Sequence, residues 1–321
     1  MLGTIHDLLP RCDDELLTLD DYQSSAPRWC TGCGDNGILT ALQRLCRDEA
    51  LPREKTVFVS GIGCSSRFPH YMNTYGFHSL HGRAIPVAEG IKIRRPDLNV
   101  FVNTGDGDCC SIGTAHWIHA VRYNMDLTVM MHDNRIYGLT KMQASPTSPR
   151  GLKSNTSPRG AYLNALNPLS VTLGVSNVSF VAQAVDWIPD LFYDIISQGF
   201  HHKGFSFIGI LQRCPNYLPT LFDPWLKDTE KTQILVHKDG IQLDPSLSKI
   251  YRNQIEHDPS DLNRARELAS SSDIVPVGIL YRNDEVPCYD DVRRPDRIYT
   301  PELIERAFNA ELDKFTVETA G

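Results

Sequence analysis

The sequence predicts an α/β fold built on a doubly wound, mostly parallel sheet, because two patterns alternate along residues 56 to 211. Short apolar runs rich in β-branched residues are typical of buried strands, and they are separated by longer segments in which apolar residues recur at helical spacing. The runs expected to form strands are 56–60, 99–103, 127–131, 179–184 and 205–211, and the segments expected to form helices are 35–46, 86–94, 111–123, 167–174 and 187–203. Since a helix separates each pair of successive strands, the strands are expected to run parallel.

Charge and composition narrow the class of protein. The chain has 321 residues, a net charge of −7 and a pI near 5.9, which argues against nucleic acid as a partner. No run of 18 apolar residues occurs, so no membrane partner is expected, and the acidic first 21 residues do not resemble a cationic signal peptide. These features predict a cytoplasmic protein.

Composition changes along the chain predict three regions. Residues 1–28 form a polar N-terminal arm, residues 29–217 form the α/β domain that carries the sites described below, and residues 218–321 form a C-terminal extension that wraps the core or a partner subunit. Within the extension, strands are expected at 233–237 and 274–281 and helices at 262–270 and 301–315.

Oxygen-bearing residues follow two of the predicted strands. Gly-Asp-Gly-Asp (105–108) follows the strand at 99–103, and Asp133 and Asn134 follow the strand at 127–131. Open parallel sheets bind ligands beyond the carboxyl ends of their strands, so Asp106 and Asn134 are expected to share one hard cation. Magnesium held by few protein oxygens usually completes its shell with phosphate, and the pattern therefore predicts a diphosphate ligand.

Four of the nine cysteines are expected to meet at the same edge. Cys30 and Cys33 form a Cys-x-x-Cys pair, and Cys64 and Cys214 each follow a predicted strand. The pair alone fits a redox dithiol, half a zinc site or half an iron–sulfur site, and the dithiol is disfavoured because no apolar strand precedes Trp29. Residue type does not separate zinc from iron–sulfur. The remaining cysteines are expected to be inert: Cys12, Cys46, Cys109, Cys110 and Cys288.

The Gly-Asp-Gly triplet followed by Asn134 resembles the signature of thiamine-diphosphate enzymes. This resemblance implies that the side chains of Asp106 and Asn134 and the carbonyl of Ile136 ligate Mg²⁺. Thiamine diphosphate decarboxylates 2-oxoacids to electron-rich adducts, which an adjacent cluster is able to oxidise one electron at a time, whereas zinc would add only structure. The neighbouring motif therefore favours an iron–sulfur cluster over zinc.

Several motifs together resemble the β subunit of 2-oxoacid:ferredoxin oxidoreductases, with the 2-oxoglutarate type the most similar. The resemblance covers about residues 25 to 217, and its motifs are Trp-Cys-Thr-Gly-Cys-Gly (29–34), Gly-Ile-Gly-Cys-Ser-Ser-Arg (61–67), His-Gly-Arg-Ala (81–84), Gly-Asp-Gly-Asp (105–108), Asp-Asn-Arg-Ile-Tyr-Gly-Leu-Thr-Lys-Met-Gln-Ala-Ser-Pro-Thr (133–147) and Arg-Cys-Pro (213–215). In order and combination, these motifs are more specific than any one of them alone.

The family resemblance implies a role for each site residue. Cys30, Cys33, Cys64 and Cys214 would ligate one [4Fe-4S] cluster. The residues implied to contact thiamine diphosphate are Ile62, Gly63, Cys64, Ser65, His81, Gly107, Asp108, Asn134, Gly138 and Leu139. His81, Arg67 and Lys141 are the expected catalytic and substrate-contacting residues, since a 2-oxo dicarboxylate needs cationic partners for its carboxylates.

The implied activity is CoA-dependent oxidative decarboxylation of 2-oxoglutarate to an acyl-CoA and CO2, with electrons passing through the cluster to ferredoxin. The reverse reductive carboxylation uses the same residues. No residue clearly supplies the carboxylate that activates the thiamine pyrimidine, and Glu89 is better explained as a structural acid. In this family the pyrimidine half belongs to a companion α subunit, so an (αβ)2 assembly is expected and the chain alone should be inactive.

Three alternatives remain open from the residues. The same chemistry on pyruvate or another 2-oxoacid would need less positive charge at the distal end of the pocket. A non-redox thiamine-dependent decarboxylase or carboligase would use the four cysteines for a structural zinc. A non-catalytic scaffold subunit would use the Gly-Asp-Gly triplet as a plain turn.

Overall fold

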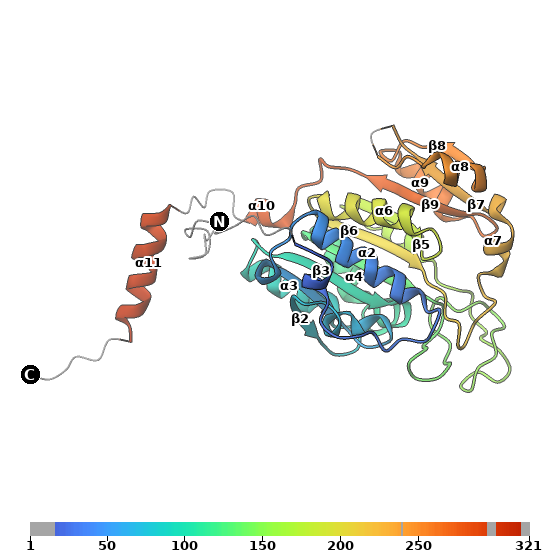
Figure 1. Ribbon diagram of the computed structural model, residues 1–321, viewed down its shortest axis with the longest axis horizontal. Helices are drawn as coiled ribbons and strands as arrows, with labels where there is room; N and C mark the ends of the chain where they lie inside the picture. Colours follow the sequence, from blue (N-terminus) through green and yellow to red (C-terminus); the bar gives the residue numbers. More distant parts are fainter. Residues whose placement is uncertain (1–16, 239, 294–299, 316–321) are drawn as a thin grey trace, which may run out of the picture.

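Nine strands form one sheet in the computed structural model, which describes residues 17–238, 240–293 and 300–315 (Figure 1). Cys12 and most of the expected N-terminal arm lie outside the described residues. The strand order is β2-β1-β3-β4-β6-β5-β9-β7-β8. The strands are β1 (Thr56–Ser60), β2 (Tyr75–His78), β3 (Asn99–Gly105), β4 (Leu127–Asp133), β5 (Phe180–Val185), β6 (Phe205–Leu211), β7 (Thr232–Val236), β8 (Gln254–Glu256) and β9 (Val275–Arg282).

The doubly wound, mostly parallel sheet that the sequence predicts is confirmed. The pairings among β1 to β6 are all parallel. β9 pairs antiparallel to β5, and β7 pairs parallel to both β9 and β8. Every residue of β1, β4, β5 and β6 is buried, as expected for strands covered on both faces. β3 and β4 each extend two residues beyond the predicted ends, which brings them to Gly105 and Asp133.

Two strands, β2 and β8, form where the sequence predicted no strand. Residues 75–78 form the edge strand β2, which pairs with β1. All four of its residues are exposed, so the strand lacks the buried apolar face that makes a strand recognisable in a sequence.

Helices cover both faces of the sheet. The helices are α2 (Gly34–Asp48), α3 (Ala84–Arg94), α4 (Thr114–Tyr123), α5 (Pro168–Leu173), α6 (Pro189–His201), α7 (Asp223–Lys227), α8 (Pro245–Ile250), α9 (Leu262–Ala269), α10 (Tyr289–Arg293) and α11 (Pro301–Asp313). α2 and α6 pack on one face, and α3, α4, α5 and α9 on the other. A π-helical turn (Asp108–Ile112) precedes α4, directly after the Gly-Asp-Gly triplet.

The region after residue 217 adds to the sheet. The strands expected at 233–237 and 274–281 are present as β7 and β9, and β9 joins the main sheet through β5. α11 lies apart from the sheet and its helices (Figure 1), and it exposes Leu303, Phe308 and Leu312. Among the residues that the structure describes, no helix combines the length and apolar character needed to cross a membrane.

Tyr22 fastens the segment before α2 to the core. Its side chain is fully buried, and its hydroxyl donates a 2.6 Å hydrogen bond to the carbonyl of Leu51. Tyr22→Phe is expected to lower the free energy of unfolding by about 1 kcal/mol, because a buried hydrogen bond is lost while the ring stays in place. Urea denaturation measures this. Tyr75→Phe, at a tyrosine that is 61% exposed, is the control, and equal losses in the two variants would contradict the prediction.

Candidate functional site

The site lies where β1, β3, β4 and β6 end. These four parallel strands are neighbours in the sheet, so the loops that follow them emerge at one edge. The chain reverses direction of winding between β1 and β3, which is where open α/β sheets form a ligand crevice. The predicted gathering of Cys64, Asp106, Asn134 and Cys214 at one edge of the sheet is confirmed.

A cavity of about 60 Å³, here called the acidic cavity, lies between the loops after β1, β3 and β4. All ten residues expected to contact the thiamine cofactor line it, and so do Asp106 and Ile136. His132, Tyr137 and Thr140 also line it, although the sequence analysis assigned them no role. The structure therefore brings the predicted magnesium and cofactor residues to one place.

Asp106 is buried at the base of the acidic cavity. Its Oδ2 accepts hydrogen bonds from Ser145 Oγ at 2.5 Å and Thr147 Oγ1 at 2.6 Å. Thr147 Oγ1 also lies 2.8 Å from Asp133 Oδ1. Burial, together with repulsion from Asp133, raises the pKa of Asp106 to about 7. Two buried carboxylates this close are costly when both are ionised, and a divalent cation would offset that cost.

Asn134 and Ile136 provide the other oxygen atoms of the predicted magnesium site. The backbone amide of Ile136 donates to Asn134 Oδ1 at 3.1 Å, and the Asn134 carboxamide nitrogen donates to Gln212 Oε1 at 3.0 Å. Asn134 Oδ1 thus accepts one hydrogen bond and has a lone pair still available. The carboxylate of Asp106, this amide oxygen and a backbone carbonyl form the hard oxygen set that magnesium prefers.

Asp108 holds two loops of the acidic cavity together. Its Oδ1 accepts from the backbone amides of Gly82 at 2.7 Å and Ile62 at 3.2 Å. The same oxygen lies 2.8 Å from His81 Nδ1, at an ion-pair distance without the alignment of a hydrogen bond. Asp108 therefore fixes the His81 loop against the loop after β1.

Residue 107 must be a glycine because the Tyr137 ring lies against its backbone. A Cβ at this position would lie 2.2 Å from Cε1 of Tyr137, whose hydroxyl donates to the Gly107 carbonyl at 3.0 Å. Contacts of that length do not occur between real atoms, so any side chain here would displace the Tyr137 ring. The second glycine of the triplet is explained by this packing.

A second cavity of about 270 Å³, here called the cysteine cavity, adjoins the acidic cavity. Cys30, Cys33, Cys64 and Cys214 all line it, and the two cavities share Cys64, Asn134, Gly138 and Leu139 as wall residues. A Cβ on Gly138 would lie 3.6 Å from Cys64 Sγ and 3.9 Å from Cys214 Sγ, so both sulfurs lie close to this glycine. The four cysteines from distant parts of the chain therefore surround one space.

Burial controls the chemistry of these thiols. Burial, reinforced by the carboxylate of Asp35, raises the pKa of Cys33, and the same causes raise the pKa of Cys64 to about 12. Such thiols ionise when a metal supplies the compensating positive charge. In the described parts of the chain no three Cys, His, Asp or Glu side chains are close enough together to bind a single ion.

The other cysteines lie elsewhere. Cys46, Cys109, Cys110 and Cys288 are buried and do not line the cysteine cavity, in keeping with the expected inert roles. Cys46 belongs to the apolar face of α2, and Cys109 and Cys110 lie in the π-helical turn.

Of the two cations expected to contact substrate, one lines a cavity and the other does not. Arg67 lines the cysteine cavity, with its Nε buried and without a hydrogen-bond partner among the described residues. Lys141 is exposed, has a left-handed backbone (φ 70°) and lines neither cavity. The role expected for Lys141 stays a prediction.

Several residues that hold the predicted metal-binding side chains in place were not expected from the sequence. Ser145 and Thr147 bind Asp106, and Gln212 contacts both Asn134 and Cys33. The buried His132 places its Nδ1 2.7 Å from Asp35 Oδ1. The only signal in the sequence was the presence of polar residues at the ends of apolar strands, which does not reveal their partners.

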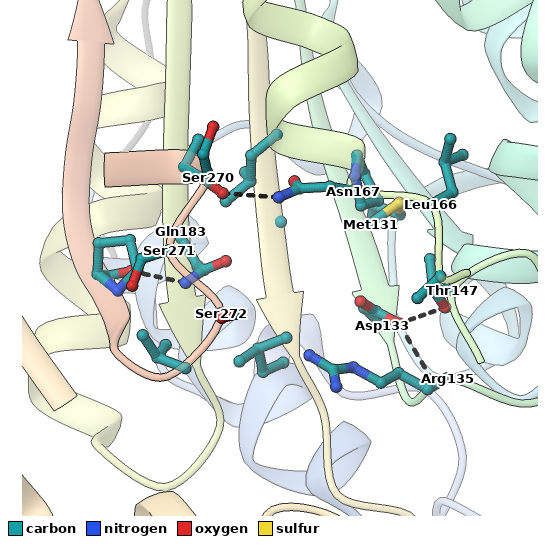
Figure 2. Close-up of a pocket in the computed structure, with 18 of the residues that line it drawn as sticks. Met131, Asp133, Arg135, Thr147, Leu166, Asn167, Gln183, Ser270, Ser271 and Ser272 are labelled. Atoms are coloured by element: carbon teal, nitrogen blue, oxygen red, sulfur yellow. Dashed lines mark hydrogen bonds between the residues drawn. The ribbon is translucent and has the colours of Figure 1, made fainter. Parts of the chain in front are cut away.

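A third cavity, of about 260 Å³, lies on the other side of Asp133 (Figure 2). Asp133 accepts from the backbone amide of Arg135, and the carboxamides of Asn167 and Gln183 donate to the carbonyls of Ala269 and Pro276. None of the four clustered cysteines lines this cavity. The side-chain amides of Asn167 and Gln183 are thus bonded within the chain itself.

Comparisons with known proteins define first the class and then the family. A family model described as the thiamine pyrophosphate enzyme C-terminal TPP binding domain matches residues 61–210, the segment that contains the acidic cavity. A second model, the C terminal region of the pyruvate ferredoxin oxidoreductase beta subunit, matches residues 247–295. The chain thus contains the binding domain of a thiamine-diphosphate enzyme.

Matches to individual proteins indicate the family more specifically than the two family models do. The chain is 39% identical to subunit beta of 2-oxoacid:ferredoxin oxidoreductase 1 from Aeropyrum pernix, over 82% of this chain and 80% of that protein. It is 41% identical to the 2-oxoglutarate oxidoreductase subunit KorB of Mycobacterium tuberculosis, over 72% of this chain and 62% of that protein. A solved 2-oxoglutarate:ferredoxin oxidoreductase from Magnetococcus marinus matches with a TM-score of 0.76 and 34% identity, covering 92% of this chain and 96% of that one.

This chain belongs to the family of 2-oxoacid:ferredoxin oxidoreductase β subunits, which are components of oxidoreductases. The resemblance inferred from the motifs is confirmed.

Glu89 lies in α3 and does not line the acidic cavity, so it does not face the cofactor residues. Its side chain is 14% exposed, its Oε1 lies 3.8 Å from His119 Nδ1, and burial raises its pKa to about 7. Between pH 4.5 and 7 the folded chain holds a proton that the unfolded chain loses, so this group makes the free energy of unfolding fall as pH rises.

Glu89→Gln replaces the carboxyl with a group that does not ionise, so it removes this group's contribution to the fall in the free energy of unfolding with rising pH. Relative to the wild type, the variant is expected to be more stable by about 1–3 kcal/mol at pH 8 and nearly equal at pH 5. Denaturant unfolding at the two pH values measures the difference. A stability difference that does not change with pH would contradict the assignment of a buried, protonated Glu89.

Proposed function

We propose that this chain is the β subunit of a CoA-dependent 2-oxoglutarate:ferredoxin oxidoreductase. The observation that carries the proposal is the common wall of the acidic and cysteine cavities, formed by Cys64, Asn134, Gly138 and Leu139. A thiamine site and a cluster site on either side of this wall would be close enough for electron transfer between them.

The residues of the acidic cavity suit Mg²⁺ and the diphosphate end of thiamine diphosphate. Asp106, the Asn134 amide oxygen and the Ile136 carbonyl would hold the ion, and the ion would offset the charge of the buried Asp106 and Asp133 pair. The loop residues that line the cavity would hold the cofactor: Ile62, Gly63, Cys64, Ser65, His81, Gly107, Asp108, Gly138 and Leu139. This part of the proposal is supported by the match of residues 61–210 to a thiamine-binding domain.

The cysteine cavity fits one [4Fe-4S] cluster on Cys30, Cys33, Cys64 and Cys214. Four thiols line a cavity of about 270 Å³, and the ferredoxin-linked family to which the chain belongs favours a cluster over a structural zinc ion there. When bound, thiamine diphosphate supplies the decarboxylation chemistry and the cluster accepts the electrons.

The chain's own residues bind and orient the reactants. Asp108 holds the His81 imidazole at the acidic cavity, where it can contact a phosphate or a substrate oxygen. Arg67 presents a fixed positive charge to the cysteine cavity and would bind a substrate carboxylate. The apolar Leu139 lies in the common wall of the two cavities.

The proposed substrate is 2-oxoglutarate. Several relatives are named 2-oxoglutarate synthase subunits, and the solved relative carries 2-oxoglutarate, coenzyme A and succinyl-CoA. Pyruvate is the alternative substrate, since it would not need a cation for a second carboxylate. Electrons would leave to ferredoxin, as the names of the relatives indicate for those proteins.

The proposed partner is an α subunit in an (αβ)2 assembly. Several relatives are named as β subunits, and no carboxylate of the acidic cavity is free to activate the pyrimidine, because Asp106 and Asp108 are both engaged. Within this assembly, residues 29–217 would form the cofactor-binding domain and residues 218–321 an extension toward the partner.

Asp106→Ala tests the cofactor assignment. In the αβ complex the variant is expected to lose Mg²⁺-dependent binding of thiamine diphosphate by at least about 100-fold, because one of three metal ligands is removed. Isothermal titration with Mg²⁺ and the cofactor measures binding, while iron and labile-sulfide assays should be unchanged. Unaltered cofactor affinity would count against the magnesium site, and a colourless wild-type protein containing zinc would replace this proposal with the non-redox alternative.

Arg67→Met tests the substrate assignment. The variant is expected to lower kcat/KM for 2-oxoglutarate by about 10- to 100-fold, because a charge-assisted hydrogen bond to a carboxylate is lost. Turnover of 2-oxoglutarate and pyruvate with a viologen acceptor measures it, with Arg94→Met, an exposed arginine on α3, as the control. A wild-type preference for pyruvate, or equal losses in the two variants, would contradict the role of Arg67.

A further inference from the structure

We infer that Gln212 is a positioning residue that ties the magnesium site to the cluster site and holds the cluster at a higher reduction potential. This inference rests on the proposed function. Gln212 follows β6 directly and is 1% exposed, and its side chain lies between Cys33 and Asn134. Its backbone amide donates to the carbonyl of Asp133 at 3.0 Å, so its position is set by the pairing of β6 with β4.

One chain of hydrogen bonds fixes the orientation of both carboxamides. The backbone amide of Ile136 can only donate, so the Asn134 atom at 3.1 Å is the oxygen Oδ1. The Asn134 nitrogen must then face Gln212, whose nearest atom at 3.0 Å must be the acceptor Oε1. Consequently the Gln212 nitrogen points the other way, toward Cys33.

The Gln212 nitrogen has two hydrogens, and both have partners. One is donated to Cys33 Sγ at 3.3 Å, and the other to the carbonyl of Arg213. The carboxamide therefore uses both donors and its acceptor within a buried network. A fully satisfied buried amide is held in a single orientation, because any rotation would leave polar groups unpaired.

The oxygen and the nitrogen of the Gln212 carboxamide contact different sites. At Oε1, the bond to Asn134 keeps the asparagine oxygen turned toward the magnesium position. At Nε2, the N–H···S bond brings a partly positive hydrogen against the sulfur of Cys33, and hydrogen bonds to the sulfurs of a cluster are among the factors that set its reduction potential. This bond stabilises the more negative, reduced cluster.

Two variants separate the two ends. Gln212→Glu keeps an oxygen for Asn134 but replaces the donor at Cys33 with a carboxylate oxygen. Gln212→Leu keeps most of the volume but removes both interactions. Gln183→Leu is the control, since Gln183 is a buried carboxamide on the adjacent strand β5 whose nitrogen donates to Pro276, away from both cavities.

The experiment uses the αβ complex with its cluster. The midpoint potential is measured by a redox titration followed by electron paramagnetic resonance at pH 8.5, and the affinity for thiamine diphosphate with Mg²⁺ by calorimetry. In Gln212→Glu we expect the cluster to be about tenfold harder to reduce, which is about 59 mV for one electron, with cofactor affinity within about twofold of the wild type. In Gln212→Leu we expect a lower potential together with about tenfold weaker cofactor binding.

The outcomes are distinct. Wild-type potentials in both Gln212 variants, or the same changes in Gln183→Leu, would overturn the inference. Loss of cluster iron from Gln212→Glu, with cofactor binding retained and Gln183→Leu normal, would support a role in positioning Cys33. A wild-type complex without a cluster would refute the proposed function itself, before any variant is compared.

Discussion

The parallel pairing of β1, β3, β4 and β6 is the constraint on which the site depends. Parallel strands that are neighbours in one sheet end at the same edge, so the loops after residues 60, 105, 133 and 211 must emerge together. These loops carry Cys64, Asp106, Asn134 and Cys214. A change in the order of the strands would separate the cysteines from the carboxylate even if every loop kept its local conformation.

Buried charge is the second feature of this edge. Asp106 and Asp133 are both almost fully buried, and their pKa values are raised, mainly by burial. The thiols of Cys33 and Cys64 have raised pKa values for the same reason. Ionising so many acidic groups that are buried in one region costs free energy. Bound cations would lower that cost.

Shared side chains connect the two cavities. Asn134 borders both, and Gln212 joins it to Cys33 through a single carboxamide. Asp35, which hydrogen bonds His132 from the start of α2, lies beside Cys33 as well. The acidic cavity and the cysteine cavity are therefore joined by a network of hydrogen bonds.

The sequence by itself determined the fold class and most strand positions, and it singled out the candidate ligand-bearing residues that the structure places at one edge of the sheet. Buried parallel strands are continuous apolar runs, and metal ligands need particular residue types at strand ends, so both leave local patterns such as 205–211 and Gly-Asp-Gly. Only the tertiary structure decided which polar groups meet. It showed β2 as an exposed edge strand, placed Arg67 but not Lys141 at the cysteine cavity, and brought Ser145, Thr147 and Gln212 into contact with the predicted ligands. The physical reason is that a hydrogen bond between residues as distant as Cys33 and Gln212 has no periodicity along the chain and exists only once the strands have paired.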